Sequence, residues 1–382
     1  MTDPTAATPV VQSRRVDWIE LFFDLAMVAF ITQLAHGMHG SPGPAEFLTF
    51  LAWSVPAWWA WTNVVACVNV LPVLPARPLA IALLAAMGAI GLMAASVTET
   101  TERAWAFALA NALLRLVLLV LWIYRAKSAG HSPFLSVLYN GATAVIWAAS
   151  IFVPSPLNLV LWGIAILVEV LLLRLRNRQL ATTIRVDIGH ASERLGLFMI
   201  ILMGESVLSL VTALSAHWNP ASGLAALVGF VAIALIAWGF FVAGAGVVEE
   251  GLAQLEDAHN TSALLDTVMF LPYLIVISVT MFSAGLATTV SHPGEPLAPG
   301  AAITLCGGLA LFYWTNAIVM RRYGRPWARL LPWAVPAAVL PVAIAFGAAG
   351  VTATVALGLV AGTVILVLGV SIVSHPRVYR GA

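Results

Sequence analysis

Long apolar stretches alternate with short polar segments along almost the whole chain. Each stretch has roughly 17 to 27 residues, which at 1.5 Å per residue is enough to cross about 30 Å of hydrocarbon as a helix. The pattern predicts an all-α polytopic membrane protein with about 12 transmembrane helices. The expected spans cover residues 17–37, 45–69, 79–97, 104–124, 134–153, 157–175, 194–214, 222–247, 264–290, 300–320, 328–348 and 351–374.

Composition supports a lipid environment. Hydrophobic residues make up 61% of the 382 positions and charged residues 9%, whereas a soluble domain carries about 25% charged residues. The expected partners are therefore the lipid bilayer and an unknown small molecule. The net charge of +1 excludes nucleic-acid binding driven by bulk charge. Cys67 and Cys306 lie in apolar stretches and are interpreted as packing residues rather than a disulfide.

Arginine and lysine gather in alternate loops, which predicts the orientation. The loops near residues 40, 155, 218, 293 and 349 contain neither. Because basic loops stay in the cytoplasm, we expect both termini there, with the protein in the cell (inner or plasma) membrane. The inner segments hold Arg14, Arg15, Arg77, Arg125, Lys127, Arg174, Arg176, Arg178, Arg185, Arg321, Arg322, Arg325, Arg329, Arg377 and Arg380.

The pattern predicts two similar halves, with convergence of similar-looking apolar hairpins as the alternative. After a cytoplasmic tail at 1–16, six helices are expected over 17–178 and six more over 179–380. Six spans in each half would make the repeat parallel, as in several transporter folds that bind cargo between their halves. The second half contains an acidic inner loop near 249–266, interpreted either as a solvated linker or as a cation or partner site.

One acidic residue interrupts an apolar helix far from its ends. Glu205 lies about 16 Å beyond Arg194, close to the middle of the bilayer. Arg115 is at a similar depth in the first half, so an ion pair between Glu205 and Arg115 is the simplest arrangement. Acidic and basic groups at that depth usually mark a pathway or a site. A purely structural pair remains the alternative.

The first helix carries a second candidate for a functional site. Glu20 and Asp24 are four residues apart and share one helix face, so they could hold a proton between them. Alternatively, Glu20 is hydrated at the interface and Asp24 pairs with an arginine.

Other polar residues lie near these acids. His190, Glu193 and Arg194 begin the seventh helix, either as a proton relay at an inner gate or as an interfacial cap with Ser192 at the N-cap. Ser206 belongs to a hydroxyl stripe that serves helix packing or ligand contact.

Further positions inside the spans leave alternatives open. Asn63 and Asn111 could line a cavity or bridge helices. Glu169 is expected to pair with the arginines that follow it or to reach the lipid edge, and Pro272 is expected to break its helix. The histidines give no metal-site spacing, and no metal or other cofactor is expected.

Three motifs resemble one family. They are VDWIELFFDL at 16–25 followed by QLAH at 33–36, FALANALLR at 107–115, and HASERLGLF at 190–198 running into ILMGES at 201–206. This combination resembles the low temperature requirement protein A family, which implies a multi-pass bacterial membrane protein without implying a biochemical activity. One departure is that the helix at 271–278 has Tyr273 but lacks the histidine that family members commonly carry there.

The favoured hypothesis is a proton-coupled transporter of an unknown small solute, with Glu205, Arg115 and Asp24 lining a central cavity. One alternative is an intramembrane enzyme that uses a buried carboxylic acid on a lipid or isoprenoid. No Cys/His pair, glycine-rich phosphate loop or Asp-rich diphosphate motif supports that alternative. The third hypothesis is a structural or sensory protein. The oligomeric state is left open.

Overall fold

The computed structural model describes residues 16–70, 76–128, 130, 132–180, 187–257 and 261–374. The tail expected over 1–16 lies outside the described residues except for Val16. So do Arg14, Arg15, Arg185, Arg377 and Arg380, and nothing is described of the side chains of Arg176 and Arg178. Where it is described, the chain folds into helices joined by short loops, which confirms the expected all-α membrane fold.

The first group of helices is formed by residues 18–180. It comprises α1 (Trp18–His36), α2 (Pro44–Val70), α3 (Ala76–Ser96), η1 (Val97–Glu99), α4 (Ala104–Ser128), α5 (Phe134–Ser136), η2 (Val137–Gly141), α6 (Ala142–Ser150) and α7 (Leu157–Leu180).

The second group follows from residue 188. It comprises α8 (Ile188–Ala216), α9 (Pro220–Asp257), α10 (Thr261–Met269), α11 (Leu271–Ser291), α12 (Pro299–Ala302), η3 (Ile303–Gly307), α13 (Gly308–Arg322), α14 (Trp327–Gly347), η4 (Ala348–Gly350) and α15 (Ala353–Ser374).

The number of membrane spans differs from the expected twelve. Within the described residues, ten helices are long and apolar enough to cross a membrane, so the count is corrected to about ten. The two expected spans outside these ten are α2, whose tryptophans and polar residues lower its hydropathy, and residues 134–150. The second, expected over 134–153, is a continuous helical stretch of α5, η2 and α6 that ends at Ser150 and is shorter than each of the ten.

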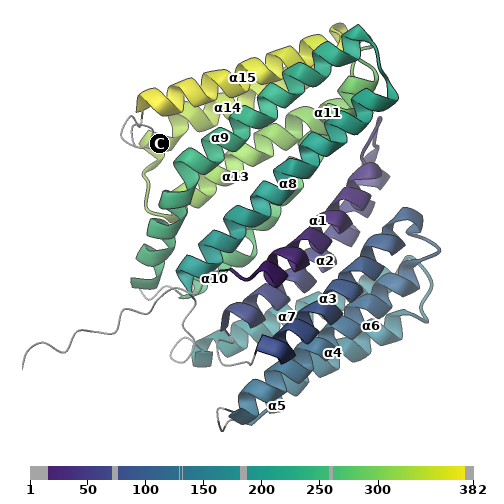
Figure 1. Ribbon diagram of the computed structural model, residues 1–382, viewed down its shortest axis with the longest axis vertical. Helices are drawn as coiled ribbons and strands as arrows, with labels where there is room; N and C mark the ends of the chain where they lie inside the picture. The colour runs from purple at the N-terminus through teal and green to yellow at the C-terminus, as the bar shows by residue number, and fades with distance from the viewer. Residues whose placement is uncertain are drawn as a thin grey trace, which may run out of the picture.

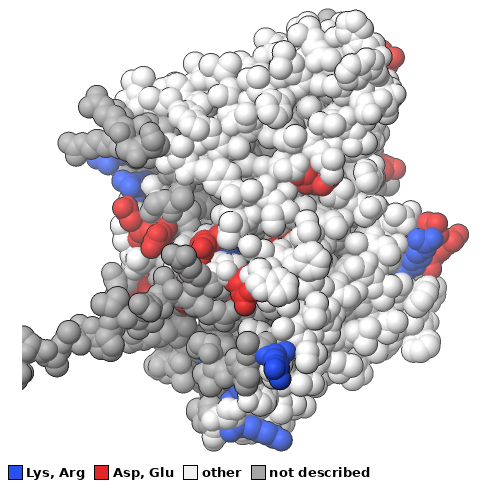
Figure 2. All heavy atoms as spheres, in the orientation of Figure 1, with Lys and Arg blue, Asp and Glu red and all other residues white. Residues whose placement is uncertain are grey.

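The two groups of helices lie side by side and meet at α1 (Figure 1). Helix α1 packs against α3 within its own group and against α8 and α11 of the second group. Figure 2 shows mostly uncharged side chains along the visible lengths of the helices, with charged side chains gathered mainly near helix ends. This distribution is what contact with lipid requires. Any polar side chain buried between α1 and α8 therefore lies at the boundary of the two groups.

Two helices of the second group extend further into the polar inner segments than the sequence predicted. Helix α8 begins at Ile188 rather than near residue 194, and α9 continues to Asp257. Most of the expected acidic loop at 249–266 is therefore helical. The expected break at Pro272 is present, because α10 ends at Met269 and α11 begins at Leu271 with this proline in its first turn. The Trp58 indole donates a hydrogen bond to the Met269 carbonyl at 2.8 Å, next to the break.

Candidate functional site

Two acidic side chains of α1 are completely buried where α1 meets α8. Glu20 and Asp24 lie one helical turn apart, and both have 0% exposure. The alternative in which Glu20 is hydrated at the interface is wrong. Carboxylates in such a position need a cation or a proton, because their ionised form loses most of its hydration there.

The cation is Arg194 of α8, which is 1% exposed. Its Nε lies 3.0 Å from Asp24 Oδ2 and its Nη2 lies 2.9 Å from Asp24 Oδ1, a two-point contact. Its Nη1 lies 3.2 Å from Glu20 Oε2, so one guanidinium contacts both acids. The indole of Trp61 on α2 donates to Asp24 Oδ1 at 2.9 Å. The guanidinium also lies within 5.8 Å of the Phe23 ring centroid. Asp24 therefore pairs with an arginine, as one of the two alternatives expected.

His190 completes this cluster from the first turn of α8. It is 2% exposed, and its Nε2 lies 3.0 Å from Glu20 Oε2 without the alignment of a hydrogen bond. Asp187, not Ser192, is the N-cap residue, because its Oδ1 accepts from the His190 backbone N–H at 3.0 Å. The Ser192 hydroxyl instead donates to the Gly189 carbonyl. Glu20, Asp24, His190 and Arg194 are called the junction cluster below.

Asn69 at the end of α2 holds the start of α8 in place, and it was not among the residues selected from the sequence. Its Oδ1 accepts from the Asp187 backbone N–H at 3.0 Å, and its Nδ2 donates to the Asp187 carbonyl at 3.2 Å. The same Nδ2 lies 3.3 Å from His190 Nδ1. The one available signal was an amide side chain in an otherwise apolar helix end. Through Asn69, the first group of helices positions His190 opposite Glu20.

A small cavity lies beside the junction cluster. Its volume is about 60 Å³, which is room for a few water molecules. Its wall is almost entirely apolar, although Arg194 and Asn69 lie on it, and α10 closes one side. The lining residues are Trp61, Thr62, Val65, Ala66, Asn69, Ala191, Arg194, Leu195, Leu264, Val268 and Met269.

Arg115 pairs with Glu169 of α7, so the expected pair with Glu205 is wrong. The two side chains are both 0% exposed, and Arg115 Nε lies 2.6 Å from Glu169 Oε1. The Trp59 indole donates to the other carboxylate oxygen. The expectation that Glu169 pairs with the following arginines or reaches the lipid edge is therefore also wrong. Both partners belong to the first group of helices, which separates this pair from the junction cluster.

The two asparagines named from the sequence lie inside the first group. Asn111 is buried one turn before Arg115, and its Nδ2 donates to the Phe107 carbonyl at 3.1 Å. Asn63 is half-buried, and its Oδ1 accepts from the Tyr139 hydroxyl at 2.8 Å. Asn63 therefore bridges two helices, which was one of the two alternatives.

Glu205 and Glu193 do not join the junction cluster. Glu205 is half-buried, and its closest described polar contact is the Ser209 hydroxyl of its own helix at 3.4 Å. Glu193 is exposed and accepts from the Val16 backbone N–H at 3.2 Å. Neither acid therefore contributes to the central charged site that the sequence predicted.

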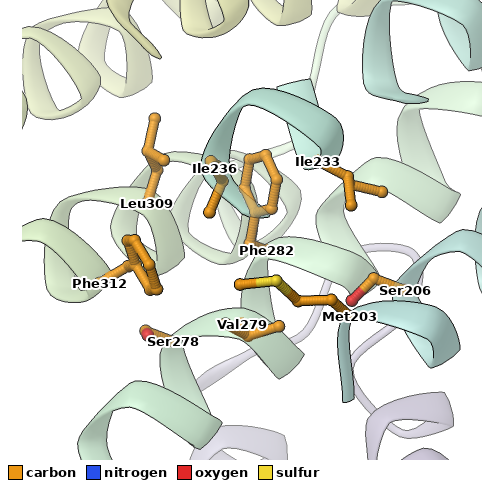
Figure 3. A pocket seen from close by; sticks show the side chains of 9 residues that line it. All are labelled: Met203, Ser206, Ile233, Ile236, Ser278, Val279, Phe282, Leu309 and Phe312. Atoms are coloured by element: carbon orange, nitrogen blue, oxygen red, sulfur yellow. The ribbon is translucent and has the colours of Figure 1, made fainter. Parts of the chain in front are cut away.

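Ser206 faces a separate cavity within the second group. This cavity has a volume of about 20 Å³ and is lined mainly by apolar side chains (Figure 3). The Ser206 hydroxyl donates to the Leu202 carbonyl at 3.3 Å, within α8. The other lining residues are Met203, Ile233, Ile236, Ser278, Val279, Phe282, Leu309 and Phe312. Ser206 thus has a packing position and no polar connection to Glu205.

The family model for the bacterial low temperature requirement A protein (LtrA) matches residues 15–372. The chain belongs to this family. The matched region includes every member of the junction cluster and the Arg115–Glu169 pair. Comparison with curated proteins gave no match, and comparison with solved structures gave none. Family membership agrees with a multi-pass membrane protein. Among the residues described, no group of three or more His, Cys, Asp or Glu could hold a metal ion.

Proposed function

We propose that this LtrA family member is a proton-coupled transporter of a small solute, with the junction cluster as its proton-binding site. The observation that carries the proposal is that two completely buried carboxylates share one guanidinium at the boundary of the two groups of helices. With both acids ionised and His190 neutral, the cluster has a net charge of −1. One added proton makes it neutral.

The proton would reside on Glu20 or His190. Asp24 is held by two guanidinium contacts and one indole, whereas Glu20 has a single guanidinium contact and faces the imidazole. Arg194 keeps its charge at all physiological pH values. With a charge of −1 the cluster is most stable where water or a cation reaches it, and when neutral it is most stable when buried. Protonation therefore shifts the balance between two conformations, which a coupled transporter requires.

The position of the cluster links protonation to movement. Glu20 and Asp24 belong to the first group of helices, and Arg194 and His190 belong to the second. Neutralising one acid weakens the attraction between α1 and α8, so protonation would change how the groups contact each other. The proposed parallel halves would then move around a site at their boundary, as in other transporters with internal repeats.

The cavity beside Arg194 is too small for a solute, and its wall is almost entirely apolar, so it is not a hydrated proton route in this conformation. The conformation described here would therefore be a closed one, with the solute site formed when α1 and α8 separate.

The test is solute-driven proton movement in proteoliposomes that contain a pH-sensitive dye. Pools of amino acids, sugars, organic acids and inorganic ions would be added to the wild type, to Glu20→Gln and to the exposed control Glu102→Gln. We expect one pool to change the internal pH in the wild type and the control, and Glu20→Gln to abolish the change. Solute-driven proton movement that persists in Glu20→Gln would contradict the proposed site.

A structural role is the second candidate, supported by a specific observation. Among the described residues, each buried acidic side chain has an arginine within 3.2 Å. If every pool leaves the internal pH unchanged and Glu20→Gln only lowers the thermal stability, the cluster is a connection between the two groups of helices and the transport proposal fails.

A further inference from the structure

A second polar site lies at the end of the second group, away from the junction cluster. A cavity of about 400 Å³ opens between the last turns of α9 and the turn joining α13 to α14. Figure 2 shows basic and acidic side chains side by side at this edge of the molecule, where α9 ends. The lining residues are Val247, Glu250, Gly251, Gln254, Tyr323, Gly324, Arg325, Pro326 and Arg329.

Close packing fixes the shape of this cavity. The ring of Tyr323 lies so close to α9 that a Cβ at Gly251 would be 2.1 Å from it. Gly324 has a φ of +79°, which reverses the chain after α13 at little cost for glycine. Tyr323 is 6% exposed and packs with Leu252, Leu255 and other apolar side chains behind the cavity. Burial raises the pKa of its hydroxyl, which therefore stays protonated.

The cavity presents opposite charges on its two sides. Arg325 and Arg329 come from the α13–α14 side, and Glu250 and Gln254 come from α9. Within the described part of the chain, neither of these two arginines has a carboxylate within 4.0 Å. Two guanidiniums without a carboxylate partner fit a phosphate group, and the carboxylate opposite them fits an ammonium group.

The surroundings place the cavity at the level of lipid head groups. Trp327, the first residue of α14, follows the lining residue Pro326 and is 38% exposed. Its ring stacks on that of Trp314 in α13, with centroids 6.1 Å apart. A partly exposed tryptophan at a helix end is typical of the membrane interface. An exposed apolar stripe follows along α14 from Trp327 at four-residue spacing, through Leu331, Val335 and Val339. Four-residue spacing keeps these side chains near one helix face, which faces lipid, while Arg329 lies nearly opposite Trp327 and Leu331 around α14.

We propose that this cavity binds the phosphoethanolamine head group of a membrane phospholipid. The phosphate contacts Arg325 and Arg329, and the ammonium contacts Glu250. Basic pockets beside transmembrane helices are a common form of lipid recognition. This site is independent of the proposed transport function.

The experiment is a lipid titration of the full chain in detergent, followed by native mass spectrometry. Phosphatidylethanolamine, phosphatidylglycerol, phosphatidylcholine and soluble glycerophosphoethanolamine would be compared. We expect phosphatidylethanolamine to bind most tightly in the wild type. The double variant Arg325→Gln/Arg329→Gln should bind it about thirtyfold more weakly. The charge-matched control Arg77→Gln/Lys127→Gln, at exposed helix ends of the first group, should bind it normally.

A second variant tests the head group. Glu250→Gln should bring the affinity for phosphatidylethanolamine down to that for phosphatidylglycerol. Equal binding of all three lipids by the wild type, or unchanged binding in the double variant, would overturn the proposal. Glycerophosphoethanolamine binding as tightly as the lipid would also overturn it, because the ligand would then be a soluble phosphate ester.

Discussion

Arg115 and Glu169 illustrate how much depends on a single side chain in this protein. Their charged groups are 2.6 Å apart, with no exposed surface on either side chain. Arg115 Nη1 and Nη2 are buried and make no hydrogen bond to any described residue. The pair is therefore tolerated mainly through its mutual contact and the Trp59 indole. Removing one partner leaves the other as an uncompensated buried charge.

At the residue scale, we predict that Arg115→Met lowers the stability by about 3 to 5 kcal/mol and that Glu169→Leu has a similar effect. The double variant should be more stable than either single variant, because no lone charge remains. Unfolding in detergent would measure all three.

The exposed pair Arg103–Glu99 provides the control. These side chains are 44% and 49% exposed at a distance of 3.0 Å, so Arg103→Met should cost less than about 1 kcal/mol. A double variant less stable than both single variants would contradict this account of the buried pair.

At the scale of elements, glycines decide where helices of the second group touch. A Cβ at Gly285 on α11 would lie 2.5 Å from the backbone nitrogen of Leu305 in η3. A Cβ at Gly308 on α13 would lie 2.6 Å from the backbone nitrogen of Phe282. The backbones of α11 and the η3–α13 segment are therefore in direct contact, as is common between membrane helices with small residues at their interface. Gly204 on α8 has nothing within 4 Å of the same position.

We predict opposite effects of the same substitution at these glycines. Gly285→Ala should lower the stability by about 1 to 3 kcal/mol, because α11 and η3 must move apart. Gly204→Ala should leave the stability unchanged or raise it by up to about 1 kcal/mol, because alanine favours the helix and fits the open space. Thermal unfolding of both variants in one detergent is the measurement. Equal losses at the two positions would rule out direct backbone contact as the cause.

At the scale of the whole molecule, the two groups of helices form one bundle joined through α1 and α8 (Figure 1). The junction cluster lies at this boundary, and the polar cavity near Arg325 lies at one end of the bundle. The side of the membrane on which that end lies follows from the basic loops and stays a prediction.

Cysteine labelling of whole cells tests the orientation. Trp218 is 81% exposed in the loop between α8 and α9, and Arg321 is exposed at the end of α13. With a membrane-impermeant maleimide, Trp218→Cys should react in intact cells and Arg321→Cys only after permeabilisation. The native Cys67 and Cys306 are both buried and should give little background. Reaction of Arg321→Cys in intact cells would reverse the topology.

The sequence predicted helix positions well where apolar runs end at charge or proline. Residues 17–37 were expected in the first helix, and α1 covers Trp18–His36. The helix bounds were predicted less well at the polar inner ends of the spans, because the backbone hydrogen bonds of a helix continue beyond the point where the hydropathy of the sequence falls. Helix α9 therefore extends to Asp257 through several acids.

The candidate site was predicted in part. Glu20, Asp24, His190 and Arg194 were all selected as polar residues in or beside apolar helices, and the structure brings these four together. Glu205 was also selected on its depth, but depth along a helix does not determine which direction a side chain faces. Glu169 was assigned to Arg174 and Arg176 of its own helix. Five positions place Arg174 about 140° around the helix from Glu169, and seven positions place Arg176 on the same face but about 10 Å further along the axis.

The sequence by itself determined that this protein is a bundle of membrane helices and that several of its charges are buried. Hydropathy is a sum over neighbouring residues, so it can be evaluated without any knowledge of the fold. Only the tertiary structure decided that Asp24 meets Arg194, 170 residues away, and that Arg115 meets Glu169. Those contacts depend on how each helix is rotated about its own axis. Packing against neighbouring helices sets that rotation, and in lipid it proceeds through close backbone approach and interhelical hydrogen bonds.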